Sequence, residues 1–221
     1  MISNNLLVIQ NKIRLALDNS GRSADSCTLV GVSKTKPLSL MKEAFSSGLK
    51  DFGENYVEEF NSKYKEYKPE GFNYHFIGKL PTKKVRKIVG NVKLIHSVSS
   101  LKLAKKIDFV SQEEGIVQNI LLQINQGGES SKSGFENDIS LYFDELLNLS
   151  NIKILGLMSI PPFSEPARPF FISLRELRDN LESQFSIKLP YLSMGMSGDF
   201  EEAIIEGSTH VRIGTSIFGS R

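Results

Sequence analysis

The chain has 221 residues, of which 40% are hydrophobic and 24% charged, and its formal net charge at pH 7 is +2. This length suits one domain that buries a full core, so residues 1–221 are expected to form a single domain. The small net charge gives no sign of the strongly basic or acidic composition that proteins with highly charged partners have.

The N-terminal segment has the pattern of an amphipathic helix. Apolar residues recur every three or four positions, and the run Asn19-Ser20-Gly21 ends the pattern. The apolar positions are Ile2, Leu6, Ile9, Ile13 and Leu17. We therefore expect a helix ahead of the first strand.

From Thr28 onward, short apolar runs typical of strands alternate with helical stretches. The expected strands are 28–33, 51–53, 74–77, 93–98, 117–124, 152–160, 189–194 and 210–213. The expected helices begin near Leu38, Asn55, Thr82, Ser99, Phe135, Arg168 and Ser197. Strands separated by helices indicate a parallel sheet, and eight strands are enough to close a barrel. We predict an α/β fold, a single TIM-type (β/α)8 barrel with an additional N-terminal helix. An open doubly wound sheet is the alternative, which periodicity does not distinguish from it.

A lysine stands at the tip of the first predicted strand. Lys34 ends the apolar run that begins at Thr28, and Thr35-Lys36-Pro37 does not continue a strand. The carboxyl ends of parallel strands point into the ligand crevice, where a lysine that loses its proton can attack an aldehyde. Lys36 is the rival nucleophile, although Pro37 indicates that the chain is already turning away. By itself, a lysine in this position is more often a solvated strand end.

The ends of the last two predicted strands have the residues of a phosphate site. Ser197 follows the seventh strand in a turn of small residues and is placed to cap the next helix. Gly214 and Thr215 follow the eighth strand, where a backbone N–H and a hydroxyl can face the same anion. Because TIM barrels often hold phosphate in the loops after strands seven and eight, the two loops together predict a phosphate site.

Six short motifs follow one another along nearly the whole chain. They are Val32-Ser33-Lys34-Thr35-Lys36-Pro37, Phe52-Gly53-Glu54-Asn55-Tyr56-Val57, His75-Phe76-Ile77-Gly78, Gly156-Leu157-Met158, Ser193-Met194-Gly195-Met196-Ser197 and Val211-Arg212-Ile213-Gly214-Thr215. With these motifs in this order, the chain resembles the pyridoxal-phosphate homeostasis protein family. The resemblance implies a barrel like the N-terminal domain of bacterial alanine racemase, which holds pyridoxal 5′-phosphate (PLP) as a Schiff base. It also implies a role in intracellular PLP homeostasis, by buffering or delivery.

The resemblance assigns individual residues to the cofactor. Lys34 matches the lysine that carries PLP covalently, and Arg212 matches the residue that faces the pyridine nitrogen. The positions that match the surroundings of the phosphate are Ser197, Gly214 and Thr215. Asn55 and His75 match residues that line the cofactor pocket.

The chain departs from the family pattern in two places. Where the family usually reads His-Phe-Ile-Gly-x-Leu-Gln-x-Asn-Lys, this chain has Leu80-Pro81-Thr82-Lys83-Lys84. Glu58 stands where a glutamine is expected after Asn55-Tyr56-Val57. The first change alters a loop near the mouth of the barrel, while the positions matched to PLP are unaffected.

Arg212 argues against efficient catalysis. Enzymes that use PLP as a strong electron sink usually hold the ring nitrogen protonated against a carboxylate, whereas arginine has only donors. The resembling racemase also takes a catalytic group from a further domain, which we expect this chain to lack. We therefore predict a PLP carrier or regulator with no catalytic residue. Weak residual PLP chemistry stays open. The alternatives are a PLP-dependent amino-acid racemase or related small enzyme, a sugar-phosphate enzyme with a Schiff base on Lys34, and a structural ion pair as the role of Arg212.

The remaining polar residues predict no second cofactor. Cys27 is the only cysteine, and the three histidines have no metal-ligand spacing, so no metal site is expected. His96 and His210 are expected to be packed or hydrogen-bonded in the core. The basic clusters in 83–87 and 102–106 are read as solvated helix faces and not as a nucleic-acid site. Without a leader or a long apolar run, the chain is expected to be a cytoplasmic monomer, mature from its first residue and not bound to membranes. Its expected partners are PLP and PLP-dependent apo-enzymes.

Overall fold

The computed structural model describes residues 1–127, 134–136 and 139–219. Within them, eight parallel strands pair in chain order, and β8 pairs with β1 to close a barrel. The strands are β1 Thr28–Val32, β2 Asp51–Glu54, β3 Asn73–Phe76, β4 Leu94–Val98, β5 Gln118–Ile124, β6 Ile152–Ser159, β7 Tyr191–Ser193 and β8 His210–Ile213. The predicted TIM-type barrel is therefore confirmed, and the open doubly wound alternative is wrong.

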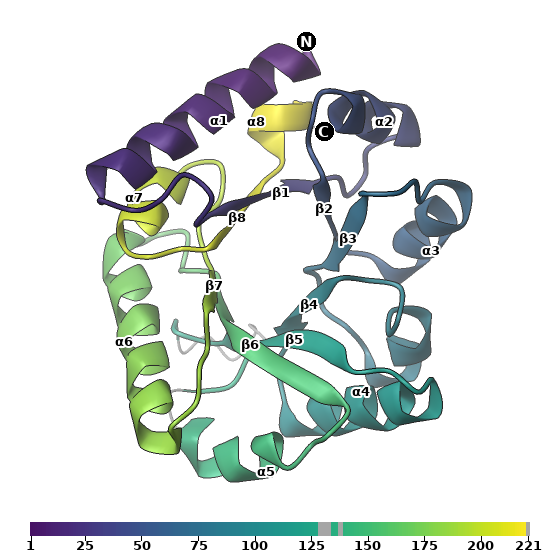
Figure 1. Ribbon diagram of the computed structural model, residues 1–221, viewed down its shortest axis with the longest axis vertical. Helices are drawn as coiled ribbons and strands as arrows, with labels where there is room; N and C mark the ends of the chain where they lie inside the picture. The colour runs from purple at the N-terminus through teal and green to yellow at the C-terminus, as the bar shows by residue number, and fades with distance from the viewer. Residues whose placement is uncertain (128–133, 137–138, 220–221) are drawn as a thin grey trace.

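Helices surround the barrel on its outer side (Figure 1). The α-helices are α1 Ile2–Asn19, α2 Leu38–Ser46, α3 Val57–Glu66, α4 Leu101–Glu113, α5 Phe143–Leu147, α6 Arg168–Phe185, α7 Phe200–Ile205 and α8 Thr215–Phe218. Two 3-10 helices, η1 Thr82–Lys87 and η2 Ile139–Tyr142, complete the ring. Figure 1 looks onto the N-terminal ends of the strands, so the loops that follow the strands lie on the far side.

The predicted N-terminal helix is α1. Its five predicted apolar positions are all buried, and the helix contacts α7 and α8, where the chain returns at its other end (Figure 1). Arg22, just after α1, donates from Nη1 to the carbonyl oxygen of Ile204 at 2.8 Å. Helix α1 thus packs against the part of the molecule that carries the loops after β7 and β8.

The start of α7 differs from the sequence prediction. The helix begins at Phe200 with Asp199 as its N-cap, so the prediction that Ser197 caps it is wrong. The reason is a separate turn ahead of the helix. The N–H groups of Asp199 and Phe200 donate to the carbonyl oxygen of Met196, and the N–H of Met196 donates to Asp199 Oδ1. Ser197 lies within this turn.

The interior of the barrel has an apolar part and a polar part. Leu94, Leu121 and Met158 are buried together and are separate from the large core between the strands and the helices. The polar part consists of buried side chains from β3, β4, β7 and β8, namely His75, His96, Ser193, His210 and Arg212. Since buried polar groups must find hydrogen-bond partners, this part of the interior is highly ordered.

No helix in the described parts of the chain is long and apolar enough to cross a membrane.

Candidate functional site

Lys34 lies in a tight turn directly after β1. The strand ends at Val32, and the N–H of Lys36 donates to the carbonyl oxygen of Ser33 at 3.1 Å. Thr35 has a φ of +61°, a left-handed conformation that side chains with a Cβ rarely adopt, so the chain reverses immediately after Lys34. Lys36 therefore points elsewhere, and its Nζ donates to the carbonyl oxygen of Gly219 at 3.0 Å.

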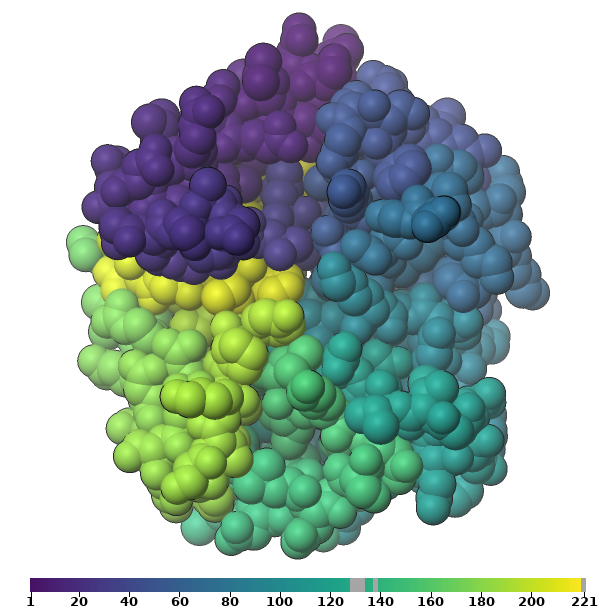
Figure 2. Space-filling model, in the orientation of Figure 1, coloured from purple at the N-terminus to yellow at the C-terminus, as the bar shows by residue number. Residues whose placement is uncertain are grey.

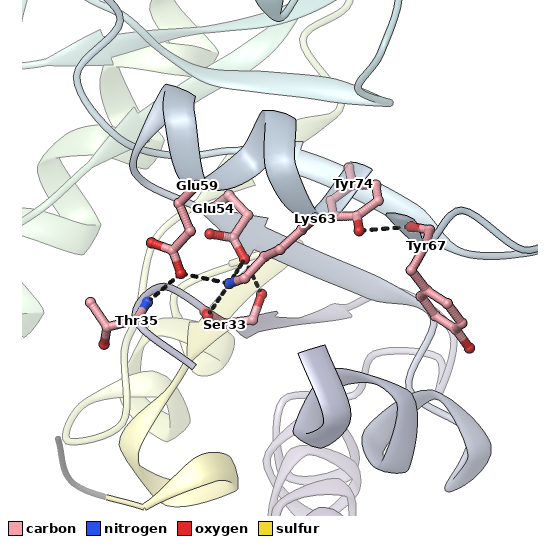
Figure 3. A network of polar contacts seen from close by, with 7 residues as sticks. All are labelled: Ser33, Thr35, Glu54, Glu59, Lys63, Tyr67 and Tyr74. Carbon is pink, nitrogen blue, oxygen red and sulfur yellow. Dashed lines mark hydrogen bonds and ion pairs between the residues drawn. The ribbon is translucent and has the colours of Figure 1, made fainter. Parts of the chain in front are cut away.

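A buried ion-pair network supports this turn from outside the barrel (Figure 3). Lys63 reaches from α3 and donates from Nζ to the carbonyl oxygen of Ser33 (2.8 Å), to Glu54 Oε1 (2.7 Å) and to Glu59 Oε1 (2.7 Å). The hydroxyl of Ser33 donates to Glu54 Oε1, and the N–H of Thr35 donates to Glu59 Oε1, both at 2.7 Å. The residues on both sides of Lys34 are thus held by the same cation and its two carboxylates.

Within this network, the pair of Lys63 and Glu54 is almost entirely removed from water, whereas the side chain of Glu59 is 23% exposed. The side chain of Lys63 is 9% exposed and that of Glu54 is 0% exposed. Burial raises the pKa of Glu54, and the neighbouring Lys63 opposes this shift. Sequence reasoning missed the network because Lys63 belongs to a strongly charged helix. The available signal was the Glu59–Lys63 pair, four residues apart on a helix that follows the Phe52-Gly53-Glu54 motif.

The two predicted phosphate loops lie next to each other and next to β1. Thr215 Oγ1 donates to Ser197 Oγ at 3.1 Å, which joins the loop after β7 to the loop after β8. A Cβ on Gly214 would lie 3.1 Å from the carbonyl oxygen of Val32, so the second loop passes close to the strand that leads to Lys34. The structure therefore brings Ser197, Gly214 and Thr215 to the same side of the barrel as Lys34.

Arg212 extends from β8 into the barrel and is 5% exposed. Its Nη1 donates to the carbonyl oxygen and to the hydroxyl of Ser193, at 2.6 and 2.7 Å, and its Nη2 donates to the carbonyl oxygen of Ser159 at 2.9 Å. Burial lowers the pKa of Arg212 to about 10, and the charge of Asp199 opposes this shift. Within the described residues it forms no salt bridge, so the structural ion-pair alternative has no support.

The C-terminal ends of β2, β3, β5 and β6 border a cavity of about 250 Å³. Asn55 and Gly78 line it, together with Ile77 and Gln123. The side-chain oxygens Asn55 Oδ1 and Ser159 Oγ are buried without a hydrogen-bond partner among the described residues. Of these two residues, Asn55 lines the cavity, and its side-chain oxygen fits a polar ligand that would complete its hydrogen bonds.

His75 is not brought to this end of the barrel with the other predicted residues. It is fully buried, lies 2.9 Å from both Asp51 and His96 through its two ring nitrogens, and borders a different cavity with Lys93 and His210. That cavity, of about 420 Å³, opens at the N-terminal ends of the strands. His96 and His210 are buried and hydrogen-bonded, as predicted.

Comparison with known proteins identifies the family. Residues 9–221 match the family model described as "Alanine racemase, N-terminal domain". The pyridoxal phosphate homeostasis protein of Aquifex aeolicus is 45% identical over 217 residues, which cover 96% of this chain and 95% of that protein. This chain belongs to the pyridoxal phosphate homeostasis protein family. The resemblance drawn from the sequence motifs is thereby confirmed.

Solved structures agree with the family assignment. PipY of Synechococcus elongatus, a structure with PLP bound, is 32% identical to this homeostasis-family chain with a TM-score of 0.87, and the similarity covers 99% of this chain and 100% of that one. An alanine racemase of Clostridium difficile has a TM-score of 0.74 at 15% identity, over 96% of this chain and 57% of that one. The second similarity shows a shared fold.

Proposed function

We propose that this protein binds PLP covalently and reversibly through Lys34 and that it buffers or delivers the cofactor in the cytoplasm. The observation that supports this proposal most directly is that Lys34 lies at the same end of the barrel as two adjacent loops whose hydroxyls, on Ser197 and Thr215, lie 3.1 Å apart. The turn that carries Lys34 is held by Lys63 and Glu59. The relatives' name and the PLP bound to PipY support the same cofactor.

The donor set fits PLP at each of its ends. Ser197 and Thr215 offer hydroxyls and Gly214 offers a close backbone approach, which suit a phosphate. Arg212 would meet the pyridine nitrogen, and Asn55, with its unpartnered Oδ1, would line the pocket. When bound, PLP supplies an aldehyde that reacts with amines and a ring that withdraws electrons. Lys34 Nζ would bond to the aldehyde carbon, with the aldehyde oxygen and the two amine protons leaving as water, and release of PLP would take up that water again. We do not assign His75 to this pocket.

We further propose that the protein turns over little or no substrate. Arg212 already directs Nη1 and Nη2 to Ser193 and Ser159, so its guanidinium is fixed and positively charged in the interior. A fixed cation beside the ring nitrogen opposes protonation of that nitrogen, and a neutral ring stabilises a substrate carbanion poorly. The whole chain, 1–221, would then act as one barrel domain and as a monomer that passes PLP to PLP-dependent apo-enzymes.

Two assays on purified protein test these proposals. In the first, protein mixed with PLP is passed through a desalting column and then incubated with an apo-enzyme that requires PLP. We expect retained visible absorbance and recovery of enzyme activity, with weaker retention in Thr215→Val. In the second, amino acids are added to the PLP-loaded protein. Racemisation or transamination at about 1 per second or faster would contradict the carrier role.

A further inference from the structure

A continuous chain of hydrogen bonds crosses the polar part of the barrel from Arg212 to Asp51. Arg212 Nη1 donates to Ser193 Oγ (2.7 Å), which lies 2.8 Å from His96 Nδ1. His96 Nε2 lies 2.9 Å from His75 Nδ1, and His75 Nε2 lies 2.9 Å from Asp51 Oδ1. The five members come from five different strands, β8, β7, β4, β3 and β2, and the chain ends beside the cavity at the N-terminal end of the barrel.

The chemistry of the two end groups gives this series of hydrogen bonds one direction. A carboxylate only accepts, so His75 carries its proton on Nε2 and accepts on Nδ1. His96 must then donate from Nε2 and accept on Nδ1, where the hydroxyl of Ser193 donates. At the other end a guanidinium only donates, and Ser193 Oγ accepts from it. Every hydrogen therefore points from Arg212 toward Asp51, and both histidines are neutral Nε2–H tautomers.

The surroundings keep these histidines neutral. Burial lowers the pKa of His75, and the hydrogen bond and charge of Asp51 oppose this shift without cancelling it. Burial lowers the pKa of His96 further, and the charges of the other histidines and of Arg212 act in the same direction.

Burial raises the pKa of Asp51, but the hydrogen bond from His75, and to a smaller extent that from Lys93 (3.0 Å), bring it to about 2, so its carboxylate stays ionised. Asn73 donates to the same carboxylate at 3.1 Å. Among the described residues, His210 and Asp199 are further titratable groups near these hydrogen bonds, and Arg22, Asp25 and Tyr191 line the same cavity as His75. Figure 2 shows the N-terminal face of the barrel, where the purple, yellow and teal segments meet around a central dip.

We propose that Asp51, His75, His96 and Ser193 form a one-way relay that orients Arg212, so that a carboxylate at the far end of the barrel sets how Arg212 meets the cofactor ring. These four are positioning residues, and the effect on bound PLP rests on the proposed function. An asparagine in place of Asp51 both donates and accepts, which removes the direction. Lys93, half exposed and bonded to the same carboxylate oxygen, lies outside the relay and supplies a matched control.

Nuclear magnetic resonance of protein labelled with ¹⁵N only in histidine tests the relay without any cofactor. The chain has three histidines, all buried in the barrel, so the spectrum reports two relay members and His210. In the unaltered protein we expect the Nε2–H tautomer of His75 and of His96 to exceed the Nδ1–H tautomer by a factor on the order of ten or more. In Asp51→Asn this excess should fall at least about threefold at His96, which Asp51 does not touch. Lys93→Met should leave it unchanged.

The visible spectrum of the PLP-loaded protein tests the effect on the cofactor. Asp51→Asn and Ser193→Ala should both shift the absorption maximum, and Ser193→Ala should do so without changing the tautomer of His75. Lys93→Met should leave the spectrum unchanged. An unaltered His96 tautomer in Asp51→Asn, or equal effects of Lys93→Met and Asp51→Asn, would overturn the relay. If the unaltered protein bound no PLP, the proposed function would fail, whereas the histidine spectra would still decide whether the relay has a direction.

Discussion

At the scale of single residues, Lys63 is the side chain on which the turn around Lys34 most depends. Its Nζ has three acceptors, one on Ser33, one on Glu54 and one on Glu59, so each of its ammonium hydrogens has a partner. Glu54 Oε2 is buried without a hydrogen-bond partner among the described residues, so Lys63 is the cation that compensates this carboxylate. The pair therefore couples the conformation of the Lys34 turn to the position of α3.

Replacing Lys63 by methionine should destabilise the protein strongly. Removal of one partner from a buried ion pair leaves an uncompensated charge, which costs about 3–5 kcal/mol of unfolding free energy. Urea unfolding at pH 7 measures this loss. The double variant Lys63→Met with Glu54→Gln removes both charges and should recover much of it. A loss below about 1 kcal/mol in Lys63→Met alone would show that the pair does not carry the charge balance assigned to it.

The site residues differ in how far the sequence could reveal them. Lys34, Ser197, Gly214 and Thr215 lie in loops that follow strands, where chemistry is expected, so this end of the barrel could be predicted for them, although the turn that contains Ser197 could not. For Lys63 the only signal was its spacing from Glu59, because a charged helix residue looks the same whether it faces water or a buried carboxylate. Asp51 and His75 were hidden for another reason. Their roles depend on contacts across five strands that no local pattern contains.

At the scale of elements, the tips of β2 and β3 are in unusually close contact. A Cβ on Gly78 would lie 2.1 Å from the backbone oxygen of Asn55, and the hydroxyl of Ser97 donates to the carbonyl oxygen of Gly78 at 2.6 Å. Only glycine allows this approach without a backbone shift. The position of Asn55 at the cavity is therefore set by a residue of the neighbouring strand end.

Gly78→Ala should displace the segment that carries Asn55. We expect a loss of about 1–3 kcal/mol in unfolding free energy, as for other overpacked sites, together with weaker PLP retention. Gly198→Ala is the matched control, because a Cβ there meets nothing within 4 Å although the residue adjoins Ser197. Thermal unfolding and PLP retention of both variants give the comparison. Equal behaviour of the two variants would contradict the close-contact explanation.

Glu58, one of the two departures from the family pattern, pairs with lysines of the segment that follows Pro81. One of them, Lys84, stands where the family pattern also has a lysine. Glu58, at the start of α3, forms ion pairs with Lys84 (3.0 Å) and Lys87 (2.9 Å) of η1. Hydrogen bonds from Lys87 and Lys84 lower the pKa of Glu58. The carboxylate of Glu58, in place of the expected glutamine, therefore pairs with positive charges of the segment after Pro81. The two ion pairs form one contact between α3 and η1, and neither of them involves Pro81 or Lys83.

Most elements could be predicted from the sequence, and the exceptions have identifiable causes. The period of apolar residues predicted α1 and all eight strands, with strand ends that differ by at most two residues. Residues 82–87 form a 3-10 helix. The helix expected near Phe135 does not begin there, because Phe135 forms a β-bridge with Ile124 at the end of β5. Closure of the sheet was not predictable from periodicity, because only the pairing of Thr28–Val32 with His210–Ile213 distinguishes a barrel from an open sheet.

At the scale of the whole molecule, the buried histidines make stability depend on pH. Burial lowers the pKa of His75, His96 and His210, the last to about 3. In the unfolded chain each takes up a proton near pH 6.5, whereas the folded protein resists protonation. Their contribution to stability is therefore complete above pH 6.5 and is lost as the pH falls toward the folded-state pKa values.

Urea unfolding between pH 7.5 and 5 measures this dependence. Each neutral buried histidine should add a slope that approaches about 1.4 kcal/mol per pH unit below pH 6.5. His210→Gln should reduce the total slope by one such contribution. Protonation of Asp51 lowers the free energy of unfolding only in stronger acid. Burial raises its pKa, but hydrogen bonds from His75 and Lys93 outweigh this and bring it to about 2. Stability that stays constant from pH 7 to 5 would contradict the assignment of neutral histidines.

Covalent capture of PLP tests the central claim most directly. The protein is loaded with PLP and reduced with borohydride, and the modified peptide is mapped by mass spectrometry. We predict a single modification on Lys34 that disappears in Lys34→Ala and persists in Lys36→Ala, because Lys36 is turned toward Gly219. Modification of Lys36 in the unaltered protein, or undiminished labelling of Lys34→Ala, would contradict the account.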